Sequence, residues 1–323
     1  MKFESDVTKQ LYYQMLRIRL VEEKIAERYL EQEMRCPVHL CIGQEAIAAG
    51  VSANLTTDDY AMSTHRSHAH YLAKGGNLGA MLSELYGKET GCSKGKGGSM
   101  HLIDLSVGFI GATPIVGATI PIAVGAAFSA AMCGESRVTI IYFGDASVEE
   151  GVFHESINFA SLRHLPIVFV CENNLFSVYS PLSVRQPERA IINLALGHGV
   201  DAFQGDGNNV IEVYKMAKNA IDKARHGGGP TFLEFSTYRY REHCGPNFDN
   251  DLGYRSQEQA DDWLKSDPIK RLKEQMLKEK IVGNSYFDQT EQQIQEEIQQ
   301  AFDYALKSPF PDKSHLLEHV YAP

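Results

Sequence analysis

The sequence predicts an α/β protein with a doubly wound, largely parallel sheet and helices on both of its faces. In the middle of the chain, apolar runs of strand length alternate with segments of helix length. The strand-like runs are RVTIIYFGD (137–145), LPIVFVCEN (165–173), VDAFQGDG (200–207) and PTFLEFSTYRY (230–240). Strands that alternate with helices in this way imply right-handed βαβ crossovers within one parallel sheet.

Helical patterns lie before these strands and between them. Residues 5–33 place apolar side chains at helical spacing among many charges, which predicts a long surface helix. Short helical patches follow in GQEAIAAGVSANL and LGAMLSELYG, within a region rich in glycine and histidine. The segments 147–163 and 208–226 have the length and pattern of crossover helices.

The C-terminal part of the chain has a different composition. Beyond Asp251 it is charged and rich in glutamine, and 267–280 and 289–308 have the pattern of amphipathic helices with a solvated face. The predicted organisation is a helical N-terminal extension at 1–36, an α/β domain at 37–250, and a helical C-terminal extension at 251–323 packed on the same domain.

Composition and charge narrow the function classes. The 323 residues are 43% hydrophobic and 22% charged, which is ordinary for a soluble globular protein. A formal net charge of −10 without a basic block argues against nucleic acid as the main partner. The N-terminus has early charges and no apolar core, so a secretory signal is not expected. Six cysteines without a CxxC pair indicate reduced thiols in the cytoplasm rather than a disulfide framework or a zinc cluster.

One segment, 115–134, is long enough to raise the question of a membrane span, because its 20 residues carry no charge. Its proline, its many small side chains and the polar remainder of the chain favour a buried helix of a soluble protein, without membrane contact. Small residues recur at every fourth position and form one face: Gly117, Pro121, Gly125, Ser129 and Cys133. Such a face lets another backbone approach closely, so it fits either a subunit contact or a tight contact within the chain.

Polar residues directly follow two of the predicted strands. Asp145 comes after RVTIIYFG, and Asn173 and Asn174 end the run LPIVFVCENN. Ligands of parallel sheets bind at the carboxyl ends of the strands, and magnesium prefers carboxylate, amide and phosphate oxygens. Gly144 adds backbone freedom, and Ser147 opens a helix whose first N–H groups suit a diphosphate. Alone, the pattern also fits two structural turns, where Asp and Asn are common.

The stretch GDASVEEGVFHESINFASLRHLPIVFVCENN resembles the thiamine-diphosphate signature, written GDG, about thirty residues, NN; Asp145 and Asn174 are 29 residues apart. Six further blocks stand in the expected order: HLCIGQEAIAAGV, STHRSHAHYLAKGG, GCSKGKGGSMHL, PIVGATIPIAVGAA, FLEFSTYRYREH and SDPIKRL. Together they resemble the alpha subunit of the thiamine-diphosphate-dependent 2-oxoacid dehydrogenase first component, on its pyruvate and acetoin dehydrogenase side. The ordered blocks are far more specific than one GD…NN pair.

The resemblance assigns a magnesium and diphosphate site to particular residues. It implies that Asp145 and Asn174 bind magnesium through their side chains and that Phe176 binds it through its backbone carbonyl. His65 and Arg66 match the pair that contacts the diphosphate, and a guanidinium suits this because it binds phosphate oxygens bidentately. A surface salt bridge is the alternative role for Arg66.

Further positions match the cofactor pocket of the family. Val116 lies where the aminopyrimidine ring is braced, and Pro114 fills a position that is often glycine; plain core packing is the alternative for both. Gly144, Ala146 and Ser147 belong to the diphosphate turn. Ala146 stands where the signature usually has glycine, and because alanine tolerates helical geometry we expect binding to survive the extra methyl group.

Two histidines are the catalytic candidates. His243 matches the histidine at the thiazolium face of the cofactor, and His39 matches a second active-site histidine. Imidazole suits proton transfer near neutral pH because its ordinary pKa is about 6.5. A structural role is the alternative for each, and His68, His70 and His101 lie in the same loops as further candidates.

The resemblance also implies a reaction and its partners. Thiamine diphosphate would cleave a 2-oxoacid or an acetoin-like substrate through an adduct at its C2 carbon and an enamine, and the acyl group would pass to a lipoyl acceptor. The chain resembles only the diphosphate-binding half, so a separate beta subunit would supply the activating glutamate. The expected assembly is a heterotetramer of two alpha and two beta subunits, with a lipoyl-bearing acyltransferase as the further partner.

Departures from the family pattern keep other functions open. The loop REHCGPNFDNDLGYR carries Arg241, Glu242 and Cys244 where relatives often have a glycine between two histidines, which puts phosphorylation control and a pyruvate substrate in doubt. Arg241 or Arg185 could meet an anionic substrate, or both could be solvated. A stand-alone thiamine-dependent carboligase or lyase and a non-catalytic subunit are the rival functions. Nicotinamide and P-loop enzymes are disfavoured, because no GxGxxG follows a strand and GCSKGKGGS misses the P-loop spacing.

Overall fold

The computed structural model describes residues 4–318 and residue 321. At its centre is a six-stranded sheet with the order β2-β1-β3-β4-β8-β7, in which all neighbouring strands are parallel. The predicted class is therefore confirmed. The strands are β1 (Tyr60–Ser63), β2 (Phe109–Ala112), β3 (Thr139–Gly144), β4 (Ile167–Asn173), β7 (Asp201–Asp206) and β8 (Thr231–Ser236); a separate hairpin pairs β5 (Phe176–Ser177) with β6 (Ser180–Pro181).

The four predicted strands coincide with β3, β4, β7 and β8, whereas β1 and β2 were not predicted. Each of the two missed strands has only four residues, too few to display a period in the sequence. They nevertheless extend the sheet beyond β3, and the loop that follows β1 contributes to the site described below.

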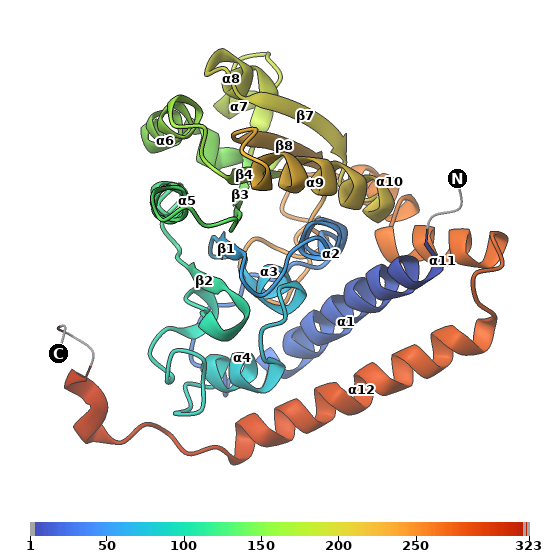
Figure 1. Ribbon diagram of the computed structural model, residues 1–323. Helices are drawn as coiled ribbons and strands as arrows, with labels where there is room; N and C mark the ends of the chain where they lie inside the picture. Colours follow the sequence, from blue (N-terminus) through green and yellow to red (C-terminus); the bar gives the residue numbers. More distant parts are fainter. Residues whose placement is uncertain (1–3, 319–320, 322–323) are drawn as a thin grey trace.

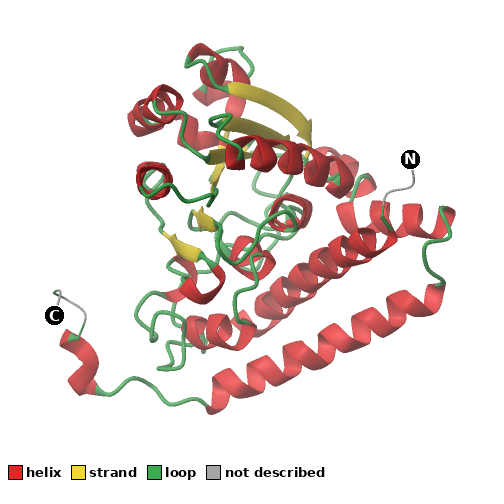
Figure 2. Cartoon of the chain, in the orientation of Figure 1, coloured by secondary structure: helices red, strands yellow, loops and turns green. Residues whose placement is uncertain are grey.

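Helices surround the sheet (Figure 1, Figure 2). The longer ones are α1 (Ser5–Tyr29), α2 (Glu45–Ser52), α4 (Leu78–Leu85), α5 (Thr119–Met132), α6 (Gly151–Leu162), α9 (Val210–Arg225), α10 (Gln257–Lys265), α11 (Pro268–Lys278) and α12 (Asn284–Lys307). Shorter pieces are α3 (His68–Ala73), α7 (Leu182–Arg185), α8 (Ile192–Gly197) and the 3₁₀ turns η1 (Gly98–Met100), η2 (Leu105–Val107), η3 (Asp145–Glu149) and η4 (Lys313–Leu317).

The sheet has a hydrophobic cluster on each face, as a doubly wound fold requires. Successive side chains of a strand point to opposite faces, and β3 illustrates this. Ile140 and Tyr142 belong to the cluster that includes α2 and α9, whereas Ile141 and Phe143 belong to the cluster that includes α5 and α6. Burial on both faces explains why this strand is a continuous apolar run rather than an alternating one.

The two ends of the chain pack against each other. Helix α1 contacts α2 on one side and α11 and α12 on another, as Figure 1 shows for the long α12 running beside it. Leu11, Met15 and Ile18 of α1 are fully buried. The long helix was predicted correctly and keeps exposed residues such as Glu23 and Glu27, but α12 supplies a second apolar partner that the local pattern does not reveal.

Two helix predictions need correction. The segment 147–163 does not begin as an α-helix, because η3 precedes α6 and the α-helix starts only at Gly151. Helix α5 is not buried throughout, since Ile122 and Met132 are 54% and 72% exposed. Three members of its small-residue face, Gly125, Ser129 and Cys133, are exposed as well. A contact within the chain therefore does not explain that part of the face, and a subunit contact stays the prediction.

No helix among the described residues is both long enough and apolar enough to cross a membrane.

Candidate active site

A cavity of about 200 Å³ lies at the carboxyl ends of β3 and β4. All but one of the predicted site residues line it, and the exception is Asp145, which is only 1% exposed between two lining residues, Gly144 and Ala146. The lining residues are His39, Thr64, His65, Arg66, Met100, Pro114, Val116, Gly144, Ala146, Ser147, Asn174, Phe176, Ser177, Val178 and His243. Small-molecule pockets usually measure about 300–1,000 Å³, so the chain encloses a space that fits part of a cofactor.

Strand register brings Asp145 and Asn174 together and so forms the acidic wall of the cavity. Strands β3 and β4 are paired in parallel with Gly144 beside Glu172, so the residues that follow each strand leave the sheet at the same edge. Asp145 begins η3 at the end of β3, and Asn174 directly follows β4. Asn173 is not part of this wall, because its amide donates to Glu234 Oε1 at 2.8 Å within the core.

A chain of buried hydrogen bonds orients Asn174. Its amide nitrogen donates to Gln44 Oε1 at 3.2 Å, and its Oδ1 accepts the backbone N–H of Phe176 at 3.2 Å. Gln44 in turn contacts Glu172 Oε2 at 3.5 Å, and the other Glu172 oxygen lies 3.2 Å from His70 Nε2. The amide oxygen of Asn174 is thereby fixed in orientation, which a metal ligand requires.

The carboxylate of Asp145 forms an ion pair with Arg185 in this structure. Its Nη2 donates to Asp145 Oδ2 and its Nη1 donates to Glu149 Oε1. The arginine side chain is only 10% exposed, so the expectation that it is solvated is wrong. Burial raises the pKa of Asp145 above its ordinary value, and the charge of Arg185 lowers it and offsets part of that rise.

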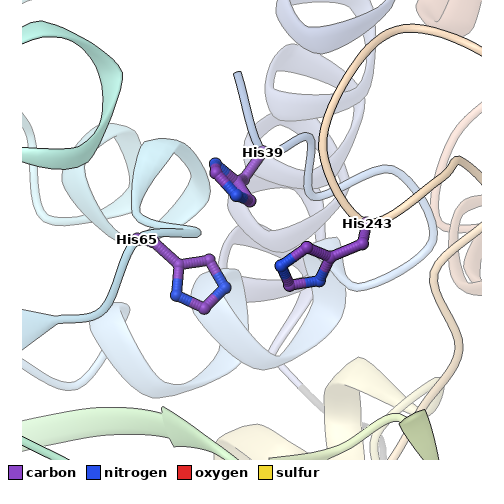
Figure 3. Close-up of side chains that lie close together, drawn as sticks. All are labelled: His39, His65 and His243. Carbon is purple, nitrogen blue, oxygen red and sulfur yellow. The ribbon is translucent and has the colours of Figure 1, made fainter. Parts of the chain in front are cut away.

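A second part of the cavity wall holds three histidines from three different loops (Figure 3). His39 precedes α2, His65 follows β1 and His243 follows β8. The ring centroids lie 4.7 Å apart for His39 and His65, 5.1 Å for His39 and His243, and 5.2 Å for His65 and His243. Burial, followed by the charge of Arg66, lowers the pKa of His39 to about 2 and that of His65 and His243 to about 3. The three imidazoles are therefore neutral at physiological pH.

Arg66 joins these loops through hydrogen bonds. Its guanidinium donates to the carbonyl oxygens of Leu40 at 2.6 Å and of His243 at 3.0 Å, and it is only 5% exposed. Burial lowers its pKa to about 10, so it remains charged at neutral pH. The alternative of a surface salt bridge is wrong, because the side chain is buried and its guanidinium contacts the backbone carbonyls of Leu40 and His243 and the ring of His243 rather than a carboxylate.

A second buried network supports the same loops. Glu22 of α1 contacts His68 Nδ1 at 2.6 Å and accepts the backbone N–H of Cys41 at 2.7 Å, while His68 Nε2 lies 2.7 Å from Ser99 Oγ. The order carboxylate, imidazole and hydroxyl matches a hydrolytic triad. Ser99 is completely buried, however, so its hydroxyl has no access to a substrate and the network is structural.

The glycine-rich run GCSKGKGGS is not a phosphate loop. Its backbone N–H groups point at the buried carboxylate of Glu84, which accepts from Ser93, Gly95, Gly97 and Gly98 at 2.7–2.9 Å. These are the groups that would otherwise cradle a phosphate. The spacing of this run predicted that it is not a P-loop, and the structure confirms this, because its N–H groups bind Glu84.

The residues present fit a metal diphosphate. A Cβ added at Gly144 would meet no atom of the described residues within 4 Å, so the glycine leaves room beside the carboxylate. Gly144 has an ordinary extended backbone, which means that conformational freedom is not its role. Ala146 does not need a left-handed backbone either, so its methyl group leaves the turn unstrained.

The histidine wall favours an anion over a cation. One nitrogen of each imidazole lies within 4.8 Å of the others, a donor set that zinc could use, and His39 Nδ1 is buried with no hydrogen-bond partner among residues 4–318 and 321. Arg66 Nη2 nevertheless lies 3.4 Å from His243 Nδ1 and places a positive charge at the cluster. A buried like charge disfavours a metal cation here and attracts the oxygens of a phosphate.

Sequence reasoning missed several contributors. Thr64, Met100, Ser177 and Val178 also line the cavity. Gln44 and Glu172, which orient Asn174, lie inside two of the recognised blocks, and that adjacency is the signal that could have found them. Arg241 was considered for an anionic substrate, but it stacks on Phe248 at 4.0 Å and is not among the lining residues.

Comparison with known proteins agrees with this geometry. A family model described as dehydrogenase E1 component matches residues 13–314. The alpha subunit of acetoin:2,6-dichlorophenolindophenol oxidoreductase from Bacillus subtilis (strain 168) is 38% identical over 313 residues, which cover 96% of this chain and 92% of that protein.

Two further relatives are pyruvate dehydrogenase E1 component alpha subunits. That of Porphyra purpurea is 36% identical and covers 97% of this chain and 92% of its own length. That of Rickettsia felis is 35% identical over 95% of this chain and 93% of its own. The chain therefore belongs to the dehydrogenase E1 component family of oxidoreductases, as an alpha subunit of the pyruvate and acetoin dehydrogenase type.

Proposed function

We propose that this alpha subunit binds thiamine diphosphate and magnesium and acts on a 2-oxoacid or an acetoin-like substrate. One observation carries the proposal: two chemically unlike walls converge on one cavity. Carboxylate and amide oxygens at the ends of β3 and β4 suit magnesium, and the imidazoles and guanidinium that line the same cavity suit phosphate. A magnesium diphosphate needs both walls at once.

Each part of the cofactor has candidate partners. The side chains of Asp145 and Asn174 and the carbonyl of Phe176 would hold magnesium. His65, Arg66 and the turn residues Gly144, Ala146 and Ser147 would hold the diphosphate. Pro114 and Val116, which line the cavity, would brace the aminopyrimidine ring. When bound, thiamine diphosphate supplies a nucleophilic carbon and an electron sink for cleavage of the bond beside a carbonyl group.

Proton transfer falls to His243 and His39. Both imidazoles are neutral at pH 7, since burial and Arg66 lower their pKa values, so each can accept a proton from the reacting group. Once protonated beside Arg66, an imidazolium is destabilised by the like charge and returns its proton readily. The same pair of histidines can therefore act in both directions within one turnover.

A beta subunit completes the proposed site. The relatives named above are alpha subunits, which implies a beta partner for this chain. The cavity of about 200 Å³ is too small for a whole cofactor, and the exposed small-residue face of α5 offers a surface for close packing. We infer a heterotetramer of two alpha and two beta subunits, and a lipoyl-bearing acyltransferase as the acceptor of the acyl group. A cytoplasmic location, in keeping with six free cysteines, is part of the proposal.

The test is to co-express the chain with its beta subunit and supply a panel of 2-oxoacids and acetoin. Reduction of an artificial electron acceptor should require both thiamine diphosphate and magnesium with at least one substrate. Addition of a lipoyl-bearing acyltransferase then separates a lipoyl-linked dehydrogenase from a stand-alone carboligase or lyase. Failure of the alpha–beta complex to bind thiamine diphosphate would contradict the proposal and favour a non-catalytic subunit.

A further inference from the structure

Arg185 is held in an unusual position for a side chain near a proposed magnesium site. It ends α7, in the segment that follows Phe176 along the chain. Its guanidinium bridges two carboxylates, Asp145 through Nη2 and Glu149 through Nη1, while its Nε donates to the carbonyl of Ser180 at 3.1 Å. Each of the three guanidinium nitrogens therefore donates a hydrogen bond to a neighbouring oxygen.

This arrangement conflicts with a metal on Asp145. Magnesium demands near-ideal octahedral geometry around its oxygen ligands, and one oxygen of this carboxylate already accepts from Arg185. Asp145 has a second oxygen, but its side chain is only 2% exposed. A divalent cation there would lie beside a guanidinium with little water to screen the repulsion. The two cations therefore compete for one carboxylate.

The segment that carries Arg185 has room to move. It borders a second cavity of about 780 Å³, whose lining includes Leu175, Pro181, Leu182 and Gln186. Its backbone is also strained, because Leu175 and Val178 adopt positive φ angles of 73° and 52°. Non-glycine residues, and β-branched ones above all, avoid this region, at about 1–3 kcal/mol each. The ion pairs of Arg185 hold one end of the segment, while Arg239 Nη2 donates to the carbonyl of Val178 at 2.6 Å.

We propose that Arg185 is a built-in counter-cation of Asp145, which divalent metal displaces when the cofactor binds. This inference rests on the proposed metal role of Asp145 and adds to it the residue that occupies the carboxylate beforehand. Arg185 stabilises the metal-free protein and weakens its affinity for metal by the same factor, because the two effects are linked in one thermodynamic cycle.

Three variants of the alpha–beta complex test the competition. Arg185→Gln removes the counter-cation. Arg189→Gln removes an exposed positive charge from the same segment and serves as the control for long-range charge. Glu149→Gln removes the second anchor of Arg185 and leaves Asp145 intact. Melting temperatures are measured in EDTA and in a titration of MgCl₂ at fixed thiamine diphosphate, which gives an apparent magnesium affinity for each variant.

Arg185→Gln should melt below Arg189→Gln in EDTA, and the gap should close as magnesium saturates. Its apparent magnesium affinity should be at least about fivefold tighter than that of Arg189→Gln. Glu149→Gln should also bind magnesium more tightly, although the loss of a negative charge alone would weaken binding. The two explanations therefore predict opposite changes in magnesium affinity for Glu149→Gln. This variant tests the inference even if Arg185→Gln does not fold.

The outcomes separate this inference from the proposed function. Equal or weaker magnesium affinity in Arg185→Gln and Glu149→Gln, with normal binding by the wild type, overturns the inference alone. If the wild-type complex gains no stability from magnesium and thiamine diphosphate, the proposed function fails and the inference fails with it.

Discussion

The two walls of the candidate active site are positioned by different means. Asp145 and Asn174 follow strands whose backbones pair residue by residue, so the sheet itself fixes where they lie. His39, His65 and His243 come from three loops that Arg66 and Glu22 join through buried hydrogen bonds. A change in the sheet wall should therefore act on binding and on the single ion pair between Asp145 and Arg185, whereas a change in the loop wall should also break the hydrogen bonds that join three loops.

Asp145→Asn should have the largest effect on binding. Loss of residues that merely support a metal ligand typically costs 10–100-fold in affinity, so loss of the carboxylate itself should weaken magnesium-dependent binding of thiamine diphosphate by more than about 100-fold. The melting temperature in EDTA should also fall, because the variant removes the carboxylate that pairs with buried Arg185 in the metal-free protein. Isothermal titration calorimetry and thermal unfolding measure the two quantities.

The surface variant Asp222→Asn, on α9, is the matched control and should bind normally. Normal magnesium-dependent binding by Asp145→Asn would remove Asp145 from the metal site.

Arg66→Met should affect both stability and diphosphate binding. It leaves the buried carbonyls of Leu40 and His243 without their donor, which should lower the free energy of unfolding by about 1.5–3 kcal/mol. It should also weaken diphosphate binding, because the positive charge of this wall is lost. Chemical denaturation and calorimetry provide the measurements, with exposed Arg163→Met as the control. A loss of affinity without a loss of stability would contradict the structural role given to Arg66.

The histidine wall predicts a pH dependence of stability. His243 has a pKa of about 3 in the folded protein and an ordinary value of 6.5 when unfolded. Below pH 6.5 the unfolded chain binds a proton that the folded protein does not, so stability falls as pH drops from 6.5 towards 3. His243→Asn should reduce this slope by up to about 1.4 kcal/mol per pH unit. Denaturation at pH 5.0 and 6.0 measures it, and an unchanged slope would show that His243 is not held neutral.

Ala146→Gly should have the smallest effect. The methyl group strains no backbone, so the variant should bind thiamine diphosphate within about threefold of the wild type; glycine in a helical turn should lower stability by about 0.5–1 kcal/mol. Binding and unfolding measurements on the same preparation decide this. A large gain in affinity would mean that the methyl group crowds the diphosphate after all.

How far the sequence could predict the site depends on how each residue is held. Asp145 and Asn174 were predictable because strand ends in a parallel sheet share an edge. The meeting of His39, His65 and His243 followed only from the family resemblance, since no local pattern joins three loops so distant in sequence. Arg185 was considered for an anionic substrate and for solvent, and its contact with Asp145 was missed because a tertiary ion pair leaves no periodic trace.

The fold likewise has features that local sequence patterns predict and features that depend on tertiary packing. The long apolar runs gave β3, β4, β7 and β8 directly, whereas β1 and β2 are four residues each and carry no readable period. The burial of α1 depends on α12, which lies more than 250 residues later in the chain. Local patterns therefore identify elements, and only the packed structure shows which of their faces are covered.

The most direct test of the central claim, that the two walls jointly bind one magnesium diphosphate, is calorimetric titration of the wild-type alpha–beta complex with thiamine diphosphate, in MgCl₂ and in EDTA. We expect saturable binding in magnesium and an affinity at least about 100-fold weaker in EDTA, because without the metal no cation links the diphosphate to Asp145 and Asn174. Equal affinity under the two conditions would contradict the account.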